Sequence, residues 1–363
     1  FPEFSGEWVT KSINDLAVVI GGGTPDTTVK SYWDGEIQWF TPSEIGKNKY
    51  VDSSLRTITE VGLNNSSAKL LPPNTILLSS RATIGECSLS LRECATNQGF
   101  QCLVSKKCNV DFLYYLIQTK KKDLIRKSCG STFLEISANE VRKIQVSVPS
   151  DVEQQKIAEL LSLIDERIAT QNKIIEKLQS LIKGIAQHCI KESTSGNTYV
   201  KLGDICQITT GKLDANAQVD NGIYPFFTCA EQPFKIDSFA FDTEALLISG
   251  NGANLGYINY YHGKFNAYQR TYVLDIFSEN IQYIKWALKV LLPKRIAIEK
   301  SSSNTPYIVL STLSDLRLPI PNKSIQCHIA KLMQSLERKL SSQIALNGSY
   351  NRLKQYLLRQ MFI

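Results

Sequence analysis

The sequence has no run of apolar residues long enough to cross a membrane. Its 363 residues are 43% hydrophobic and 21% charged, an ordinary composition for soluble domains that leaves room for two or three of them. A membrane span needs about 18 consecutive apolar residues, so this class of protein is excluded. The stretch from Phe1 to Val9 also lacks the charged-then-apolar pattern of a secretory signal. These absences predict a cytoplasmic protein.

Cysteine and histidine are too scattered for a familiar metal site or a disulfide framework. The nine cysteines lie between Cys87 and Cys327 with no C-x-x-C among them, and there are three histidines. A zinc finger and a secreted disulfide scaffold are both disfavoured. The neighbours His188-Cys189 and Cys327-His328 could approach one another, but adjacent residues on a helix point about 100° apart. We predict packing at helix ends there, reduced and mostly buried thiols, and no metal or other cofactor.

Motifs of the common nucleotide-dependent enzymes are missing as well. Gly21-Gly22-Gly23 is not followed by the G-K-[ST] of a phosphate-binding loop, so we predict a turn there. An adenine methyltransferase would need an N-P-P-Y-like stretch, and Leu71-Pro72-Pro73-Asn74 has such residues in the wrong order. The glycines between Gly250 and Gly256 lack the surrounding pattern of a dinucleotide-binding fold. We predict that the chain itself is not an enzyme.

The formal net charge of +7 is concentrated at the end of the chain. Residues 1–150 hold 17 basic and 15 acidic residues, residues 151–192 hold 6 and 7, and residues 193–321 hold 11 of each. Residues 322–363 hold 7 basic residues and one acidic residue. A basic excess fits a nucleic-acid partner, because lysine and arginine replace counterions on phosphates, and it fits a merely soluble basic protein equally well.

The two halves of the sequence repeat one another. The segment P-S-D-V-E-Q-Q-K-I-A at Pro149 returns as P-N-K-S-I-Q-C-H-I-A at Pro321. Upstream, A-T-I-G at Ala82–Gly85 returns as A-N-L-G at Ala253–Gly256, at nearly the same offset along the chain. This period far exceeds the roughly 20–50 residues of a solenoid unit. The sequence therefore predicts a duplicated domain that is followed each time by a helix.

The two predicted helices are long and amphipathic. Between residues 151 and 190, and again between residues 325 and 362, apolar residues recur in steps of three and four, the pattern of a coiled-coil seam. Ser150 and Glu153 form a capping box at the first start, whereas the second start has no Glu or Gln at this place. A helix of about 38 residues spans roughly 57 Å and cannot bury its stripe alone, so we predict that the two helices pack together. The main seam residues are Ile157, Leu161, Ile164, Ile168, Leu178, Leu336, Leu340 and Leu357.

Each helix follows a globular segment of mixed α and β character. Strands are predicted at residues 75–80, 101–105, 245–249 and 271–276, and helices at 112–127 and 281–296, the latter helical up to Pro293. Residues 191–198, K-E-S-T-S-G-N-T, are typical of a linker. The predicted segments are a globular domain at 1–149, a helix at 150–191, a linker at 192–198, a second globular domain at 199–321 and a final helix at 322–363.

This organisation resembles the specificity subunit of type I restriction-modification systems over essentially the whole chain. The residues that carry the resemblance are K-L-G-D-I at Lys201–Ile205, T-T-G-K at Thr209–Lys212, Y-P-F-F-T at Tyr224–Thr228, L-L-I-S-G-N-G-A-N-L-G at Leu246–Gly256 and Q-Q-K-I-A-E-L-L at Gln154–Leu161. No single motif is specific, but the order of domain, long helix, domain and long helix is.

The resemblance implies an α+β fold in which two pseudo-symmetric α/β target-recognition domains are separated by two long antiparallel coiled-coil helices. Each domain would read one half of an asymmetric, bipartite sequence in double-stranded DNA. The helices with the seam residues named above would bind two DNA adenine methyltransferase (modification) subunits and, through them, motor-nuclease (restriction) subunits. The spacing of the two domains would set the spacing of the half-sites.

Two loops that follow predicted strands carry the first candidate DNA contacts. Arginine can bind guanine, and asparagine can bind adenine, through two hydrogen bonds in the major groove. The candidates in these loops are Ser80 and Arg81 in the first half and Asn251 and Asn254 in the second. The alternative is that these residues only shape turns.

The next repeated segment and several basic positions add further candidates. Gln98 and Gln269 occur at equivalent places, which favours a role in the fold, while the residues beside them remain candidate contacts. Lys47-Asn48-Lys49 is predicted as an exposed basic run, and Lys120-Lys121-Lys122 as a solvated helix face. The remaining DNA-contact candidates are Lys47, Asn48, Asn97, Lys212 and Arg270.

A coiled-coil scaffold whose globular domains bind proteins is the alternative function. The basic last helix does not decide between the two, because it could face DNA, an acidic partner or solvent. Salt would discriminate, since a DNA reader loses affinity steeply as salt rises and a protein scaffold need not.

Overall fold

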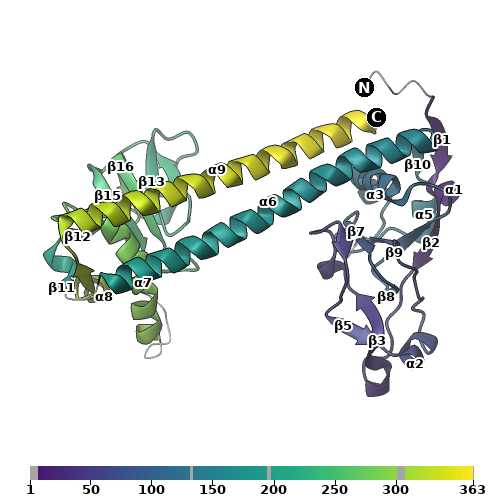
Figure 1. The fold of residues 1–363 in the computed structure, drawn as a ribbon, viewed down its shortest axis with the longest axis horizontal. Helices are drawn as coiled ribbons and strands as arrows, with labels where there is room; N and C mark the ends of the chain where they lie inside the picture. Colours follow the sequence, from purple (N-terminus) through teal and green to yellow (C-terminus); the bar gives the residue numbers. More distant parts are fainter. Residues whose placement is uncertain (1–6, 131–133, 194–197, 301–306, 363) are drawn as a thin grey trace. The chain divides into compact units, whose positions relative to one another are not determined.

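The computed structural model describes residues 7–130, 134–193, 198–300 and 307–362. The chain divides into two units: unit 1 comprises residues 1–172 and 345–363, and unit 2 comprises residues 173–344. Each unit contains one of the repeated globular segments together with part of each long helix (Figure 1). The units thus cut across both helices, which the sequence had suggested as segments of their own. No helix within the described ranges is long and apolar enough to cross a membrane.

Unit 1 contains a five-stranded sheet of order β2-β9-β6-β7-β4, a three-stranded sheet of order β5-β3-β8 and the pair β1-β10. The strands are β1 Val9–Ser12, β2 Ala17–Gly21, β3 Trp33–Phe40, β4 Tyr50–Val51, β5 Arg56–Ile58, β6 Ile76–Leu78, β7 Cys87–Ser90, β8 Cys94–Thr96, β9 Gln101–Ser105 and β10 Gln145–Val148. The short helices are α1 Ile13–Leu16, α2 Glu60–Asn64, α3 Val110–Thr119, α4 Lys121–Arg126 and α5 Ala138–Arg142.

Unit 2 contains a six-stranded sheet of order β12-β17-β15-β16-β13-β14 and the pair β11-β18. The strands are β11 Thr198–Lys201, β12 Gln207–Thr210, β13 Tyr224–Phe227, β14 Phe234–Ile236, β15 Phe241–Ser249, β16 Ile258–Ala267, β17 Thr271–Asp275 and β18 Arg317–Ile320. The helices of its globular part are α7 Ile281–Lys300 and α8 Leu310–Ser314.

Four predicted elements of the globular segments differ from the structure by more than one residue at an end. The strand expected at 75–80 is limited to β6, and the strand expected at 245–249 begins earlier, as β15. The helix expected at 112–127 is two helices, α3 and α4, that meet at Lys120. Helix α7 continues through Pro293 to Lys300, because a helix kept in place by burial tolerates one lost backbone hydrogen bond. Of the predicted linker, residues 194–197 lie outside the described residues.

Both repeats join their globular part to the long helix in the same way. The antiparallel pair β1-β10 precedes α6 (Asp151–Glu192), and the antiparallel pair β11-β18 precedes α9 (Lys323–Met361). Gln154, in the first turn of α6, accepts a hydrogen bond from the Asn109 backbone N at 3.0 Å and donates to the Pro149 carbonyl at 3.0 Å. Gln326 does the same in α9, with Asn280 N at 3.0 Å and the proline before the helix at 2.8 Å. The repeat is therefore present in the hydrogen bonds as well as in the sequence.

The starts of the two helices are capped by different residues. The Ser150 hydroxyl accepts from the Glu153 N–H at 3.4 Å, which is one of the two hydrogen bonds of the predicted capping box. The Glu153 carboxylate accepts from the Trp8 indole N–H at 3.1 Å. Asn322 caps α9, where its Oδ1 accepts from the Ile325 N–H at 3.0 Å. Asparagine is a strong N-cap residue, which explains a defined start without a capping box.

The part of α9 in unit 1 runs antiparallel to the part of α6 in the same unit. Lys354 forms an ion pair with Asp165 at 2.7 Å, and Asn347 Nδ2 donates to Asn172 Oδ1 at 2.9 Å. The residue numbers of α6 thus rise, and those of α9 fall by the same amount, from one contact to the next. This register supports the predicted antiparallel pairing.

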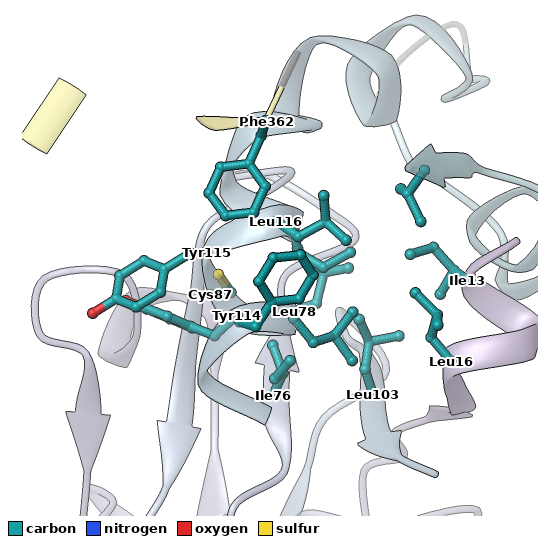
Figure 2. Packing of buried hydrophobic residues seen from close by; sticks show 14 of the residues in the cluster. Ile13, Leu16, Ile76, Leu78, Cys87, Leu103, Tyr114, Tyr115, Leu116 and Phe362 are labelled. Carbon is teal, nitrogen blue, oxygen red and sulfur yellow. The ribbon is translucent and has the colours of Figure 1, made fainter. Parts of the chain in front are cut away.

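The end of α9 completes the core of unit 1. Tyr115 of α3 and Phe362 both belong to this core (Figure 2). Phe112 of α3 is fully buried there, and the centroid of its ring lies 5.3 Å from that of Phe362. The centroid of the Trp8 ring lies 6.3 Å from that of Phe362 and 6.2 Å from that of Phe112. The last residues of the chain therefore support the domain formed by the globular segment that precedes α6.

The seam residues of both helices pack inside the chain. Buried in the cores of their units are Ile157, Leu161, Ile164, Leu178 and Leu357, and packed against these cores are Ile168, Leu336 and Leu340. The predicted amphipathic pattern is correct. The five buried side chains have no surface left for a partner subunit, so the expectation is corrected for them. It stays a prediction for Ile168, Leu336 and Leu340, which are half-buried.

A carboxylate at the same repeat position of each helix holds different cations in the two units. In unit 1, Asp165 binds Lys354 and accepts a hydrogen bond from the Tyr115 hydroxyl at 2.7 Å. In unit 2, Glu337 of α9, the repeat counterpart of Asp165, binds Lys285 at 2.8 Å and Lys289 at 3.1 Å. Burial opposes ionisation of Glu337, but the two ammonium groups hold its pKa below its usual value. Burial lowers the pKa of Lys285, so the pair depends on both partners.

Candidate nucleic-acid interface

Several chain segments meet at one end of the sheets of unit 1. The Ser80 N–H donates to the Gly99 carbonyl at 2.8 Å, and the Asn97 N–H donates to the Phe40 carbonyl at 3.1 Å. These bonds join the segments that follow β3, β6 and β8. The predicted contact residues Arg81 and Asn97 therefore lie at the same sheet end.

The corresponding segments of unit 2 meet through equivalent bonds. The Gly250 N–H donates to the Arg270 carbonyl at 2.8 Å, and the Tyr268 N–H donates to the Phe227 carbonyl at 2.9 Å. The Gln269 N–H donates to the Leu213 carbonyl at 2.9 Å, which brings in the segment after β12. Because all of these bonds join backbone groups, they hold the loops together whatever side chains the loops carry.

A glycine at the same place in each unit permits this close approach. A Cβ on Gly22 would lie 2.0 Å from the Asn97 carbonyl oxygen, and one on Gly211 would lie 1.9 Å from the Ala267 carbonyl oxygen. Both distances are far too short for a non-bonded contact between a carbon and a backbone oxygen. Gly22 was expected to form a turn, and the structure corrects this: it follows strand β2 and packs directly against the neighbouring chain segment.

The loops after β6 and β15 have the same backbone conformation at their ends. The Ser79 N–H donates to Glu86 O and the Ser79 carbonyl accepts from Gly85; Ser249 makes the same bonds with Tyr257 and Gly256. The third residue after each serine has a positive φ, Ala82 at +60° and Gly252 at +79°. The residues just before these, Arg81 and Asn251, thus occupy equivalent places.

The predicted contact residues of unit 1 differ in their access to solvent. The Arg81 side chain is 40% exposed and forms an ion pair with Glu135 at 2.6 Å. Asn97 is half-buried, and its Oδ1 accepts from the Gly99 N–H at 2.9 Å. Ser80 is fully buried. The prediction that Ser80 contacts DNA is therefore corrected, because its buried hydroxyl cannot reach a ligand.

The basic run after Gly46 is only partly exposed. Lys47 and Asn48 are exposed beside the start of β7, where the Asn48 carbonyl accepts from the Ser88 hydroxyl at 2.7 Å. Lys49 was expected at the surface, but its side chain is only 7% exposed and binds Asp111 at 2.6 Å. The pattern of alternating lysines could not show this, because the covering groups come from distant α3 and α6.

In unit 2 the predicted asparagines converge on a cysteine that sequence reasoning missed. The Cys229 thiol donates to Asn251 Oδ1 at 3.0 Å, and Asn254 Nδ2 donates to the Cys229 carbonyl at 3.0 Å. Arg270 and Lys212 are exposed at this sheet end. The sequence did point to this residue, because Cys229 directly follows the Y-P-F-F-T stretch, which contains β13. Only its distance in sequence from the asparagines concealed the contact.

The cysteines and histidines do not gather into a metal site within the described part of the chain. No group of three or more His, Cys, Asp or Glu residues there could hold a metal ion. Three of the nine cysteines are buried, four are half-buried and two are exposed, so burial is less general than predicted. Burial raises the pKa of the Cys87 and Cys102 thiols to about 12, which keeps them protonated near neutral pH.

Solved structures share the duplicated fold of this chain. A crystal structure of the S subunit of a type I restriction-modification system from M. genitalium matches 99% of this chain and 97% of that chain, with a TM-score of 0.66 at 19% identity. A second structure, from work on complex assembly and conformational transition of the type I R-M system, matches 98% of this chain and 97% of its own, with a TM-score of 0.62 at 16% identity.

The chain belongs to the family described as the type I restriction modification DNA specificity domain, which it matches at residues 5–180 and 194–347. It is 30% identical, over 92% of this chain and 88% of the relative, to the type I restriction enzyme MjaIX specificity subunit of Methanocaldococcus jannaschii. It is 42% identical to the EcoDI specificity subunit of Escherichia coli over 39% of this chain and 32% of the relative. The predicted family, α+β fold and non-catalytic role as a specificity subunit are confirmed.

Proposed function

We propose that this specificity subunit reads an asymmetric, bipartite target in double-stranded DNA, with one half-site bound by each unit. The observation that carries the proposal is the pair of equivalent sheet ends, which share backbone hydrogen bonds and differ in the side chains that they expose. The shared backbone hydrogen bonds, called the frame below, give both units the same way of docking on DNA. Different exposed side chains give different base preferences.

Direct contacts are assigned to the accessible candidates at these sheet ends. In unit 1 they are Arg81, Asn97, Lys47 and Asn48, and in unit 2 they are Asn251, Asn254, Arg270 and Lys212. Lysines contact phosphates, which fix position without reading sequence, while arginine and asparagine contact base edges. A chain that acts on host DNA resides in the cytoplasm.

Affinity for DNA depends on partner subunits. The globular segments 1–150 and 193–321 carry net charges of only +2 and zero, so phosphate attraction by this chain alone is weak. Two DNA adenine methyltransferase subunits, bound along the exposed faces of α6 and α9, supply both the missing affinity and the catalysis. Motor-nuclease subunits join through them and restrict unmethylated DNA.

The test is to co-express the chain with its methyltransferase subunit and to map methylated adenines across the host genome. A single interrupted motif supports the proposal, and replacing residues 199–321 with the corresponding segment of another family member is expected to change only one half of it. A stable complex that methylates no defined motif would contradict the DNA-reading role.

The scaffold alternative makes a different prediction for binding. In that case the isolated complex would retain its protein partners but would bind duplex DNA weakly and with little dependence on salt. The salt dependence of DNA binding by the complex separates the two, because each phosphate contact adds about 0.9 to the slope of log K against log salt.

A further inference from the structure

Arg81 is fixed at the sheet end by both its backbone and its side chain. Its backbone forms an isolated antiparallel bridge with Glu135, and its carbonyl accepts from the Thr83 N–H at 2.6 Å and the Ser79 hydroxyl at 2.8 Å. Its guanidinium donates from Nη2 to Glu135 Oε2 at 2.6 Å, while the two side chains stay 40% and 36% exposed. The guanidinium is therefore held in one place and remains open to a ligand.

The residue after Arg81 strengthens this picture. Ala82 has a φ of +60°, in the left-handed region that a residue with a Cβ disfavours. Gly252, at the equivalent place of unit 2, adopts the same conformation without that cost. Unit 1 therefore keeps the same backbone bend although alanine disfavours it. Backbone strain of this kind is found most often at functional sites and ligand-binding positions.

The partner of Arg81 also has a counterpart in unit 2. The Ile136 N–H donates to the Ser80 carbonyl at 3.0 Å, and the Ile308 N–H donates to the Gly250 carbonyl at 2.8 Å. The residues before these isoleucines, Glu135 and Tyr307, are therefore equivalent, as are Arg81 and Asn251. The backbone hydrogen bonds are repeated, but the residues at these two places are Arg and Glu in one unit and Asn and Tyr in the other.

We propose that Arg81 reads a guanine in the half-site of unit 1 and that Glu135 is its positioning residue. This inference rests on the proposed function and names the residues that set the preference. Guanine offers two acceptors, N7 and O6, that match the forked donors of a guanidinium. The bond to Glu135 uses one of the five N–H donors of arginine and fixes the direction of the others.

Glu135 also argues against a phosphate as the ligand of Arg81. The ion pair carries no net charge, and its carboxylate repels a phosphate that approaches the same guanidinium. A neutral base edge with two acceptors meets no such repulsion. The pair is partly exposed and therefore contributes little to stability.

The test compares substitutions in the assembled methyltransferase complex. Its substrates are duplexes in which each base pair of the methylated motif is replaced by the three others. Arg81→Ala is expected to lose roughly tenfold to hundredfold discrimination at one G·C pair of one half-site. Arg81→Lys should lose it too, because lysine keeps the charge without the fork. Glu135→Gln should reduce discrimination at the same pair, and Glu135→Asp should restore part of it.

Matched variants keep this test specific. Arg92→Ala removes a similar exposed ion pair, with Asp52 at 2.7 Å, at the opposite end of β7, and should leave every position unchanged. Asn251→Ala should relax only the other half-site. Thermal unfolding of each complex checks that the variants are folded.

Three results would overturn the inference. Full discrimination by Arg81→Ala, equal weakening on all duplexes with a smaller salt slope, or inactivity of both Arg81 variants on every duplex would each exclude guanine reading. All three leave the proposed function intact, provided that the unsubstituted chain directs methylation to a bipartite motif. Absence of that motif would instead contradict the proposed function itself.

Discussion

The same backbone hydrogen bonds frame the sheet ends of the two units, yet the side chains at equivalent places differ in charge. Arg81 with Glu135 stands in unit 1 where Asn251 with Tyr307 stands in unit 2. Backbone bonds are indifferent to side-chain identity, so the frame persists while the exposed residues diverge. We therefore expect sequence preference to depend on the equivalent positions at which the two units carry different side chains.

The attachment of the long helices shows the same contrast. Gln154 and Gln326 make identical bonds to their globular segments, whereas the carboxylates of Asp165 and Glu337 bind different cations. Substitutions can therefore disturb the shared and the divergent features separately.

Removing the aromatic ring at the end of the chain is expected to have the largest effect. Phe362→Ala should destabilise unit 1 by about 3 kcal/mol, because the ring is buried against Phe112 and Trp8. Denaturant unfolding measures the loss. Phe234→Ala, at a position 43% exposed in unit 2, is the control and should cost much less. Equal effects of the two substitutions would show that the end of α9 is not part of the core.

Filling the shared close approach should destabilise both units alike. Gly22→Ala and Gly211→Ala are each expected to cost about 2 kcal/mol, because the added Cβ would meet a backbone oxygen that cannot rotate away. Gly184→Ala, on α6 with no heavy atom within 4 Å of the new Cβ, should be neutral or stabilising by up to about 1 kcal/mol. If only one of the two glycines proves sensitive, the frames are less alike than their hydrogen bonds indicate.

Neutralising the carboxylate of unit 2 should cost about 1.5 kcal/mol at neutral pH. Glu337→Gln leaves Lys285, whose side chain is only 8% exposed, without its counter-ion, while partial exposure of Glu337 limits the penalty. The pKa of Glu337 is lower in the folded state than in the unfolded state. Its contribution is therefore complete above the unfolded pKa and is lost as the pH falls through the folded one.

Unfolding measured against pH checks that sign. The difference between the unsubstituted chain and Glu337→Gln should shrink as the pH falls through the lowered pKa of Glu337. Asp165→Asn is the matched variant in unit 1, where the Tyr115 hydroxyl can still donate to the new side chain. If the difference in unfolding free energy between the unsubstituted chain and Glu337→Gln stayed constant down to acidic pH, the predicted role of the charge would be contradicted.

Removing single exposed lysines should have the smallest effect. Lys47→Ala and Lys212→Ala are each expected to lower the salt slope of DNA binding by about one, with no change in sequence preference. Binding of the assembled complex at several salt concentrations measures this. Lys30→Ala, at another exposed position of unit 1, provides a comparison that is expected to keep the slope. A change in base preference would show that the lysines read bases.

Local sequence patterns were informative where neighbours along the chain decide the structure. The recurrence of Pro149 at Pro321, and of Ala82–Gly85 at Ala253–Gly256, predicted the duplication because both copies keep the same local fold. The steps of three and four predicted α6 and α9 because an amphipathic helix carries its pattern in the sequence itself. Helix α7 passed through Pro293 because burial outweighed that local signal.

The sequence by itself determined the repeat, the two long helices and the kinds of residue that are proposed to contact DNA. Only the tertiary structure decided which of those residues reach the surface. Ser80 and Lys49 are covered by groups far away in sequence, while Glu135 and Cys229 come to Arg81 and Asn251 across 54 and 22 residues. Burial and side-chain pairing depend on segments that meet only on folding, and no local pattern encodes them.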